Sequence, residues 1–572
     1  MTKLLKAIKI EKIGYGGIGL ARMADGKRIL IKGGALPGSV VDLRIVKQRK
    51  DFLEAHITHI HKHDPELVDG KPFCPHFFRM EKEASPIEDG GIENGEGKNS
   101  NSELGTIYPK LKWKIGCGGC KWQMLSYPTQ LKLKQDIVLD AFKKLAKEQI
   151  EVLPIVGSPL EKGYRNKIEF SFGKYITNSA ECRVQSAEKK TLDILSDRSV
   201  GFHKQGEFSK IVDIDSCGLI SEKANSIFFR IKELCLDSGL PVYDQMTHQG
   251  FFRHLVIREG FHTDQILVNL SVSDDNLKQS KTDKWDALLE LFKKNEFLKK
   301  SVTTFVITYN NGLGDTIKND KSETKTFWGE GYIYEKLIFE EIRRLDGDVE
   351  TNISSDEKNH LSKSPKNLPI SSKISQSPHN HQIPSEVSFR VSPFSFFQTN
   401  TLGAEQLFSL AMYMTGHVEG TILDLYCGTG SIGLSFLKAN KGNTLIGIEI
   451  VPEAIMDAQH NAKINGLENQ VLFVADPAEK ALTNNPELRA QIKDIGLVIV
   501  DPPRDGLHKN VVAFLGELKK EQDFKLLYIS CNPITMMRDI ELLLTHGFHI
   551  KQIQPVDMFP QTHHIEVIGV LT

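Results

Sequence analysis

From about residue 402 to the carboxyl terminus, apolar runs alternate with amphipathic runs, and this alternation constrains the fold more than any other feature. Apolar runs such as TILDLYC, NTLIGIEI, IGLVIVD and KLLYIS are separated by helical patterns such as PEAIMDAQHNAKING. Strands that are apolar throughout and connected by helices are typical of a parallel sheet covered by helices on both faces. The sequence therefore predicts an α/β domain with a doubly wound sheet over residues 390–572.

A glycine-rich turn after the first of these strands suits a nucleotide-type ligand. The segment ILDLYCGTGSIGLSFL places Cys427–Gly430, which includes Gly428, where backbone N–H groups of the next helix point at a polar ligand. The next strand ends in Glu449, which can accept both ribose hydroxyl groups, and later strands end in Asp476 and Asp501. Each feature alone also fits tight packing, a helix cap or a turn. Their occurrence at successive strand ends is what predicts a cofactor site.

A cysteine and a glutamate follow as candidate reactive groups. In LLYISCNP, Cys531 comes just after a predicted strand and just before a helix, where the helix dipole favours a thiolate. Cysteine is also a common small core residue, so its position alone leaves both interpretations open. In PQTHHIEVIGVL, Glu566 lies in the last predicted strand, beside His563 and His564. Alone it would be an ordinary strand residue; together with Cys531 it becomes a candidate base.

The run VIVDPPRDGL adds a stiff turn after Asp501. An Asp-Pro-Pro turn resembles the base-binding turn of nucleic-acid amino-methyltransferases, which extrude the target base from its stack. Those enzymes usually have an aromatic residue after the prolines and need no cysteine. Here Arg504 follows the prolines, and Cys531 lies downstream.

Taken together, these motifs resemble a known enzyme family. The run DLYCGTGSIGL followed by GIEI resembles the S-adenosylmethionine site of class I methyltransferases, and the set SFFQTN, DPPR, SCNP and HHIEV resembles the RNA 5-methyluridine methyltransferase family. The resemblance implies a Rossmann-like fold in which Cys531 is the nucleophile and Glu566 is the general base. It also implies that the turn at Asp501 holds the flipped base. The residues that it implies for S-adenosylmethionine binding are Gln398, Tyr426, Gly428, Glu449, Asp476 and Asp501.

The chemistry of uracil explains why this family needs a thiol. Carbon 5 of uracil is too weakly nucleophilic to take a methyl group from a sulfonium ion. Addition of a thiolate at carbon 6 creates an enolate whose carbon 5 can attack. A base must then remove the hydrogen at carbon 5 before the thiol is eliminated.

A cysteine cluster in the first half of the chain predicts a metal site. Cys117 and Cys120 form CGGC, Cys74 lies in FCPHF, and Cys182 and Cys217 are further candidates. Spacing alone is compatible with zinc, because several histidines lie nearby. These histidines are His56, His59, His61, His63 and His76.

The family resemblance favours iron over zinc. Members that act on ribosomal RNA bind a 4Fe-4S cluster through CPHF, CGGC and a later cysteine, which correspond here to Cys74, Cys117, Cys120 and Cys217. This chain departs from the family by inserting about residues 79–115 between the first two ligands. The ligands can still meet, because the cost of closing a loop grows slowly with its length.

The amino-terminal region predicts an RNA-binding module. Residues 1–62 contain 13 Lys and Arg against 5 Asp and Glu, although the whole chain has a net charge of −1. Its short alternating runs and glycine turns indicate a small antiparallel barrel, and EKIGYGGIGLAR resembles the OB-like TRAM domain. In the central region, GYRNKIEFSFG also matches the family, which implies that Arg165 and Lys167 contact the RNA backbone.

Composition completes the domain prediction. The chain has 572 residues, enough for three or four domains, and its 40% hydrophobic and 25% charged residues are ordinary for a globular protein. We expect a barrel at 1–62, a mainly β central domain at 63–330 and low-complexity insertions at about 79–115 and 346–386. No apolar stretch approaches the roughly 18 residues of a membrane span, and eight cysteines are too few for a disulfide scaffold. We therefore expect a cytoplasmic monomer.

The sequence thus predicts an S-adenosylmethionine-dependent enzyme that methylates carbon 5 of a uridine, with 23S ribosomal RNA as the expected substrate. The alternatives are an enzyme that methylates uridine 54 of transfer RNA by the same chemistry, an amino-methyltransferase that uses Asp-Pro-Pro, and a non-catalytic RNA-binding factor. The amino-methyltransferase would not need Cys531.

Overall fold

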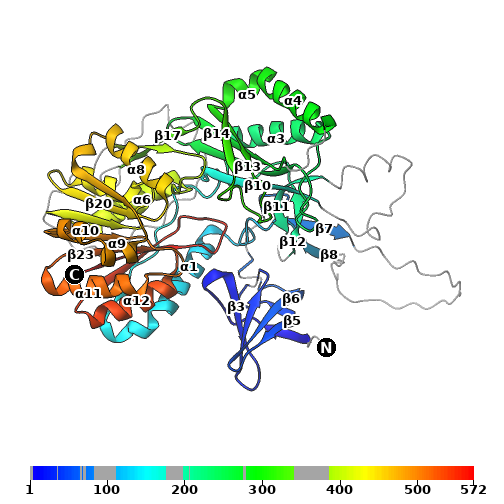
Figure 1. The fold of residues 1–572 in the computed structure, drawn as a ribbon. Helices are drawn as coiled ribbons and strands as arrows, with labels where there is room; N and C mark the ends of the chain where they lie inside the picture. Colours follow the sequence, from blue (N-terminus) through cyan, green and yellow to red (C-terminus); the bar gives the residue numbers. More distant parts are fainter. Residues whose placement is uncertain are drawn as a thin grey trace, which may run out of the picture.

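The structure is a computed structural model that describes residues 4–34, 36–64, 67–68, 72–82, 111–174, 198–204, 207–274, 279–339 and 386–572. Figure 1 shows three bodies: a small strand-rich module at the amino terminus, a central sheet with helices, and a large α/β sheet that contains the carboxyl terminus.

The amino-terminal module is a six-stranded sheet in the order β1-β5-β6-β4-β3-β2. Alternate side chains face a small core that includes Ile29, Ile31, Val41 and Leu43, as the alternating sequence pattern predicts. This arrangement is consistent with a barrel-like domain. Its elements are β1 (Leu4–Lys9), β2 (Lys12–Gly14), the 3-10 turn η1 (Tyr15–Gly17), β3 (Ile18–Arg22), β4 (Arg28–Lys32), β5 (Val40–Gln48) and β6 (Phe52–Lys62).

The central body is a seven-stranded sheet in the order β12-β11-β10-β13-β14-β15-β16, with helices packed on it. The side chain of Phe228 on α3 stacks on Phe170 of β10 at a ring separation of 3.9 Å, within one large apolar core. The strands are β10 (Lys167–Gly173), β11 (Ser199–Lys204), β12 (Glu207–Asp213), β13 (Phe252–Gly260), β14 (Gln265–Val272), β15 (Thr304–Tyr309) and β16 (Glu323–Trp328). The helices are α3 (Glu222–Asp237), α4 (Gln279–Lys294) and α5 (Glu296–Ser301).

The carboxyl-terminal body is an eight-stranded sheet in the order β21-β20-β19-β22-β23-β25-β24-β9. The first five strands are parallel, and β25 runs antiparallel to both of its neighbours. The strands are β9 (Glu151–Val152), β19 (Thr421–Leu425), β20 (Thr444–Glu449), β21 (Val471–Ala475), β22 (Ile495–Val500), β23 (Lys525–Ser530), β24 (Ile550–Val556) and β25 (Glu566–Leu571).

Helices cover both faces of this sheet. The central strand β22 is buried on both sides, since Leu497, Val498 and Ile499 are all fully inaccessible, and a separate apolar core lies on each face. The predicted doubly wound α/β fold is confirmed. The helices are α6 (Thr401–Thr415), α7 (Ser431–Ala439), α8 (Pro452–Ile464), η4 (Glu468–Gln470), α9 (Ala478–Asn484), α10 (Pro486–Gln491), α11 (Lys509–Glu521) and α12 (Pro533–Thr545).

Segments from the first half of the chain join the carboxyl-terminal body. Strand β9 extends its sheet, and helix α1 (Tyr127–Phe142), which continues into η2 (Lys143–Glu148), packs beside α12 (Figure 1). The fully buried Lys134 Nζ of α1 lies 2.6 Å from Asp557 Oδ1. A buried pair of this kind is costly to break, so it ties α1 to the segment that precedes β25.

Two further strand pairs flank the predicted insertions. Strand β17 (Ile333–Ile338) pairs with β18 (Glu386–Val391), and β7 (Phe78–Lys82) pairs with β8 (Leu111–Ile115). Most of both insertions, 83–110 and 340–385, lies outside the described residues. The predicted limits of the three domains stay a prediction. Among the described residues, no helix has the length and apolar character needed to span a membrane.

Candidate active site

The predicted site residues lie at one edge of the large sheet. Strands β19, β20, β21, β22 and β23 are parallel, so the residue after each strand lies at the same carboxyl-terminal edge. Ligands of open α/β sheets bind outside this edge. The residues that end these strands or follow them directly are Tyr426, Glu449, Asp476, Asp501 and Cys531.

The glycine turn leaves its backbone open to a ligand. Gly428 and Gly430 have left-handed backbones, with φ of 55° and 79°, and a Cβ atom at Gly428 would meet only the Phe396 ring, 4.0 Å away. Glu449 is fixed on the other side of this turn, because its carboxylate accepts hydrogen bonds from Gly428 N (3.1 Å) and Val451 N (3.0 Å). Tyr426 has a φ of 67°, a strained backbone of the kind that collects at functional sites.

Asp424 is a buried acid at this edge of the sheet that the sequence reasoning did not single out. Its side chain is buried, Gly433 N of α7 donates to its Oδ2 (3.0 Å), and its Oδ1 has no hydrogen-bond partner. Burial first, and then the charges of Asp501 and Glu449, raises the pKa of Asp424 well above its usual value. The signal was present in the sequence, because Asp424 is the only acid in the buried run TILDLYC.

The SFFQTN segment lies between the central sheet and the glycine turn. Thr429 Oγ1 donates to the Phe396 carbonyl (3.2 Å), and Asn166 Nδ2 donates to the Gln398 carbonyl (2.9 Å). The backbone of Arg165 bridges to Asn400. The buried Gln398 is therefore held at the cofactor edge by contacts from two bodies.

The sheet register brings Cys531 and Glu566 together. Ser530 of β23 is the antiparallel partner of Val567 of β25. Cys531 follows Ser530 and Glu566 precedes Val567, so the two residues lie at the same end of this ladder. Asp501 ends the neighbouring strand β22 at that edge, and the charges of both carboxylates act on the thiol. The sequence had predicted that Glu566 serves as a base for Cys531, and the strand register places the two residues at the same end of one ladder.

The electrostatics of the thiol differ from the sequence expectation. Cys531 does precede a helix, since Asn532 caps α12 through Ile534 N (3.1 Å). However, the pKa of Cys531 is raised to about 12, by burial first and then by the charges of Glu566 and Asp501, whereas Arg504 lowers it. The position before a helix therefore does not give Cys531 a lowered pKa.

The two carboxyl groups also favour protonation. Burial raises the pKa of Asp501 to about 7. Burial, and then the charge of Asp501, raises the pKa of Glu566 well above its usual value, while Arg504 opposes the shift. Three acidic groups thus share one desolvated pocket. A carboxyl that is protonated at rest can act as a base only after it has lost its proton. A nearby positive charge makes that loss easier.

Arg504 provides positive charge at this edge. Its side chain is exposed, and its carbonyl accepts hydrogen bonds from Asn532 Nδ2 (2.8 Å) and Thr535 Oγ1 (3.2 Å). The side chain of Asn532 therefore joins the Asp-Pro-Pro turn to the segment that carries Cys531. This hydrogen bond holds together two loops that are far apart in sequence.

The segment before Glu566 is held by the first half of the chain. Gln561, whose φ is 67°, exchanges hydrogen bonds with Gln130 of α1 at 2.8 and 2.9 Å, and its carbonyl accepts from Lys121 N (3.0 Å) and Trp122 N (3.1 Å). Lys121 and Trp122 directly follow Cys120. The cysteine segment is thus hydrogen-bonded to the turn that leads into Glu566.

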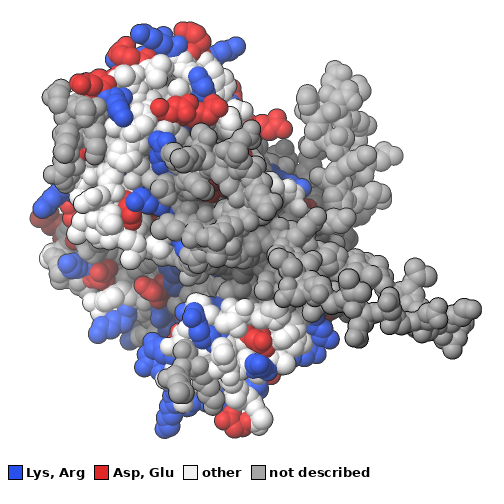
Figure 2. Space-filling view, turned by 90° about the vertical axis from the view of Figure 1, so that its right-hand side faces the viewer, with Lys and Arg blue, Asp and Glu red and all other residues white. Residues whose placement is uncertain are grey.

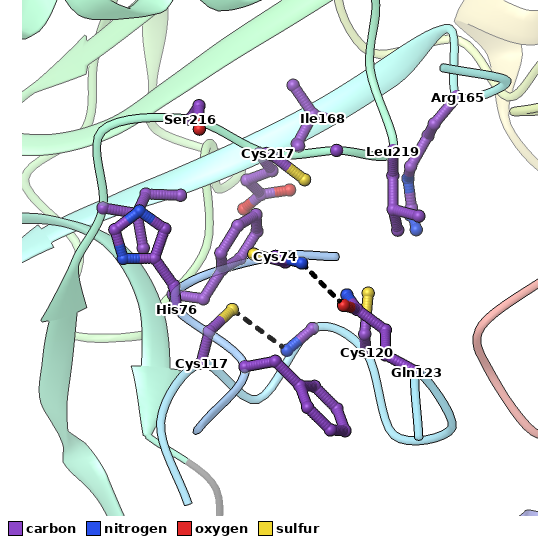
Figure 3. A pocket seen from close by; sticks show the side chains of 16 residues that line it. Cys74, His76, Cys117, Cys120, Gln123, Arg165, Ile168, Ser216, Cys217 and Leu219 are labelled. Atoms are coloured by element: carbon purple, nitrogen blue, oxygen red, sulfur yellow. Dashed lines mark hydrogen bonds between the residues drawn. The ribbon is translucent and has the colours of Figure 1, made fainter. Parts of the chain in front are cut away.

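The four cysteines that resemble family ligands line one cavity of about 220 Å³, and their side chains enter it from three separate segments (Figure 3). Cys74 N donates to Gln123 Oε1 (3.1 Å), and Gly119 N donates to Cys117 Sγ (3.4 Å). The pKa values of Cys117 and Cys120 are raised to about 12 each, by burial first and also by the charges of the other thiols. Burial also raises the pKa of Cys217 to about 11.

The histidines suggested for zinc do not assemble around the cysteines. His61 contacts Asp42 (2.7 Å) and His63 contacts Ser39 (3.2 Å) within the amino-terminal sheet, whereas His76 does line the cavity. Within the described ranges, no group of three or more His, Cys, Asp or Glu side chains is arranged to hold a metal ion. Cys182 lies outside the described residues.

The two predicted RNA contacts occupy different settings. Arg165 lies in the wall of the cysteine cavity, and its Nε donates to the Lys167 carbonyl (2.8 Å; Figure 3). Burial first, and then the charge of Arg258, lowers the pKa of Lys167 to about 8. Their roles in RNA binding stay predictions.

Comparisons with known proteins agree with this arrangement. A family model described as tRNA (Uracil-5-)-methyltransferase matches residues 382–572. An uncharacterized RNA methyltransferase of Caldanaerobacter subterraneus is 31% identical over 568 residues, covering 99% of this chain and 98% of that protein. An uncharacterized RNA methyltransferase of Bacteroides thetaiotaomicron is 30% identical over 547 residues, which cover 94% of this chain and 95% of that protein.

A solved structure has a similar fold. The tRNA (uracil-54, C5)-methyltransferase of Pyrococcus abyssi, in complex with S-adenosyl-L-homocysteine, superposes with a TM-score of 0.58 at 23% identity. It covers 99% of this chain, and this chain covers all of it.

The sheet, the glycine turn and the acids at its edge define a Rossmann-like methyltransferase. The chain belongs to the RNA uracil-5-methyltransferase family, and it is an S-adenosylmethionine-dependent enzyme that modifies RNA.

Proposed function

We propose that this enzyme methylates carbon 5 of a uridine in 23S ribosomal RNA, in the cytoplasm, through a covalent adduct on Cys531. The observation that supports this proposal best is the register of β23 and β25, which sets the thiol and a buried carboxyl at one end of the same ladder.

The proposed reaction moves protons at two groups, the Cys531 thiol and carbon 5 of the uracil. Cys531 Sγ releases its proton to water and adds to carbon 6 as a thiolate, and the negative charge moves into an enolate whose carbon 5 is nucleophilic. After carbon 5 has gained a methyl group, the carboxylate of Glu566, which must be ionised for this step, takes the hydrogen of carbon 5 as a proton, and the bond between Sγ and carbon 6 breaks. The ring recovers its double bond, and Cys531 is free again.

The methyl donor fits the open glycine turn. Glu449, held by Gly428 N, would accept the ribose hydroxyl groups, and Gln398, Tyr426, Asp476 and Asp501 would complete the site. Bound S-adenosylmethionine supplies an activated methyl group on a sulfonium. The chain's own contribution is to place this edge beside Cys531 and Glu566.

We further propose that Cys74, Cys117, Cys120 and Cys217 hold a 4Fe-4S cluster. The donor set fits, because four thiols surround one cavity of about 220 Å³. The preference for a cluster over zinc rests on the family resemblance of the four cysteines. Such a cluster would stabilise the fold or position the RNA. Its link to the catalytic turn is the hydrogen bonds from Lys121 and Trp122 to Gln561.

Metal analysis distinguishes a 4Fe-4S cluster from a zinc ion at these cysteines. Anaerobically prepared protein is expected to contain about four iron and four sulfide ions per chain. The double variant Cys117→Ser/Cys120→Ser should lose them and melt at a lower temperature, whereas Cys235→Ser, altered at a buried cysteine away from the cavity, should keep them. One zinc ion per chain, with no sulfide, would contradict the cluster.

The RNA partner is tested by supplying separate substrates. Ribosomal and transfer RNA from cells that lack this enzyme are incubated with it and with a labelled methyl donor. Label in 5-methyluridine of 23S ribosomal RNA supports the proposal. Label at uridine 54 of transfer RNA supports the second candidate, which the family model's description favours.

The basic surface of the amino-terminal module supports an RNA partner of either kind. Figure 2 shows Lys and Arg side chains spread over the lower lobe, which is this module. Clustered positive charge neutralises phosphates and releases counterions on binding. Exposed basic residues there are Lys6, Lys9, Lys12, Arg22, Arg28, Lys32, Arg44, Lys47, Arg49, Lys50 and Lys62.

Removing the positive charge of Arg504 is expected to shift adduct formation to higher pH. Arg504 lowers the pKa of both Cys531 and Glu566, so Arg504→Gln should raise both. The pH of half-maximal adduct formation should then increase by about half to one unit, since the side chain is exposed. Arg504→Lys retains the charge and should keep the parental profile. A profile for Arg504→Gln that is unchanged or moved to lower pH would contradict this account.

A further inference from the structure

The turn between β2 and β3 of the amino-terminal module lies against the catalytic segment. A Cβ atom on Gly17 would come within 3.1 Å of the His563 ring, three residues before Glu566. Gly17 has a φ of 69°, so both its backbone and its lack of a side chain allow this close approach. His563 is buried, and its Nδ1 has no hydrogen-bond partner.

Residues just before this turn anchor it to other parts of the protein. Ile13 is buried in the core of the central body, and Lys12 Nζ pairs with Asp140 of α1. The turn is therefore fixed on both sides: Lys12 and Ile13 hold its beginning, and Gly17 meets His563 at its end. Tyr15 lies between these anchors.

The side chain of Tyr15 is half-buried, packs against the core of the central body and lies within electrostatic reach of the reactive groups. The pKa of Tyr15 is raised to about 12, by burial first and also by the charges of Cys531 and Glu566, while Arg504 lowers it. The residues whose charges reach the phenol are thus the proposed nucleophile, the proposed base and the cation beside them. At neutral pH the phenol keeps its proton and remains a hydrogen-bond donor.

We propose that the amino-terminal module completes the catalytic pocket: the ring of Tyr15 forms one wall of the target-uridine site, and its hydroxyl donates a hydrogen bond to the uracil. This proposal rests on the proposed function of Cys531 and Glu566. An aromatic ring suits a flipped base, because stacking on a π face compensates for the stacking lost in the RNA. The module would then act in catalysis as well as in binding phosphates.

Tyr15→Phe and Tyr15→Leu test this proposal, with Phe52→Leu as the matched control. Phe52 is an aromatic residue of the same sheet that pairs with Arg28 in the ladder between β4 and β6. The full-length enzyme is mixed with RNA that contains 5-fluorouridine at the target, and the rate of covalent adduct formation is measured at saturating RNA. The affinity for S-adenosylmethionine is measured by calorimetry.

The expected result is a graded loss in the chemical step. Tyr15→Phe loses the hydroxyl and should form the adduct up to about tenfold more slowly. Tyr15→Leu loses the ring as well and should be about 10- to 100-fold slower. Cofactor affinity should be parental in both variants, and Phe52→Leu should form the adduct at the parental rate.

Two kinds of result would contradict this account: one overturns the role of Tyr15, and the other overturns the proposed function of Cys531. Parental rates for both Tyr15 variants would show that the turn only packs against the pocket. If Tyr15→Leu does not fold, Tyr15→Phe, which retains the packing, decides: a parental rate overturns the proposal. An adduct that still forms in Cys531→Ala would instead refute the proposed function.

Discussion

Replacing Cys531 by alanine is expected to lower methylation by about four orders of magnitude or more, equivalent to at least about 5.5 kcal/mol of transition-state stabilisation. Without Sγ no bond forms to carbon 6, and carbon 5 stays too weakly nucleophilic to accept the methyl group. The affinities for RNA and for S-adenosylmethionine should change little, because the half-buried thiol contributes a small contact area. Single-turnover transfer of labelled methyl groups measures the loss.

A second cysteine provides the control for this experiment. Cys235 of α3 is fully buried in the central core, and Cys235→Ala should retain parental transfer. Cys531→Ser tests whether a hydroxyl can replace the thiol, and it should be nearly as slow as Cys531→Ala. Parental transfer by either Cys531 variant would favour the amino-methyltransferase alternative, which needs only the Asp-Pro-Pro turn.

Replacing Glu566 by glutamine is expected to lower turnover by about 10²- to 10⁴-fold while a covalent RNA complex accumulates. Glutamine has nearly the same shape as glutamate but cannot accept the proton from carbon 5. Addition of Cys531 to carbon 6 continues, whereas elimination stalls.

The trapped complex is measured by a denaturing gel with labelled RNA. Glu541→Gln, altered at an exposed carboxylate on α12, should turn over at the parental rate and form no lasting complex. If Glu566→Gln binds RNA normally but no complex accumulates, the base must be another group. Asp501, whose pKa is raised to about 7 at the same edge, would then be the next candidate.

The repeated order of elements was predictable because each strand and helix carries its own local pattern. The apolar runs that became β19, β20, β22 and β23 are buried on both faces, so their composition alone indicated a parallel sheet. Strand β9 was not predictable in this role. It contributes two residues and pairs with β24 about 400 positions later, and no local pattern records such a contact.

The candidate site also contains features that the sequence predicts and features that it does not. Glu449 and the glycine turn were visible as motifs, since adjacent strands bring their ends together by rule. The barrel turn at Tyr15 and the pair between Lys134 and Asp557 depend on how separate bodies dock, which local sequence does not specify. Cys531 shows the same limit: its place before a helix was predicted, but the burial and carboxylates that raise its pKa were not.

Mass spectrometry of the enzyme trapped on 5-fluorouridine RNA tests the central claim most directly. Fluorine replaces the hydrogen that Glu566 would remove, so the reaction should stop after methyl transfer with the thiol still bonded. We predict a peptide in which Cys531 carries a methylated fluorouracil nucleotide. Methylation of ordinary substrate RNA by the same preparation, with no covalent species on Cys531 in the fluorinated sample, would contradict the account.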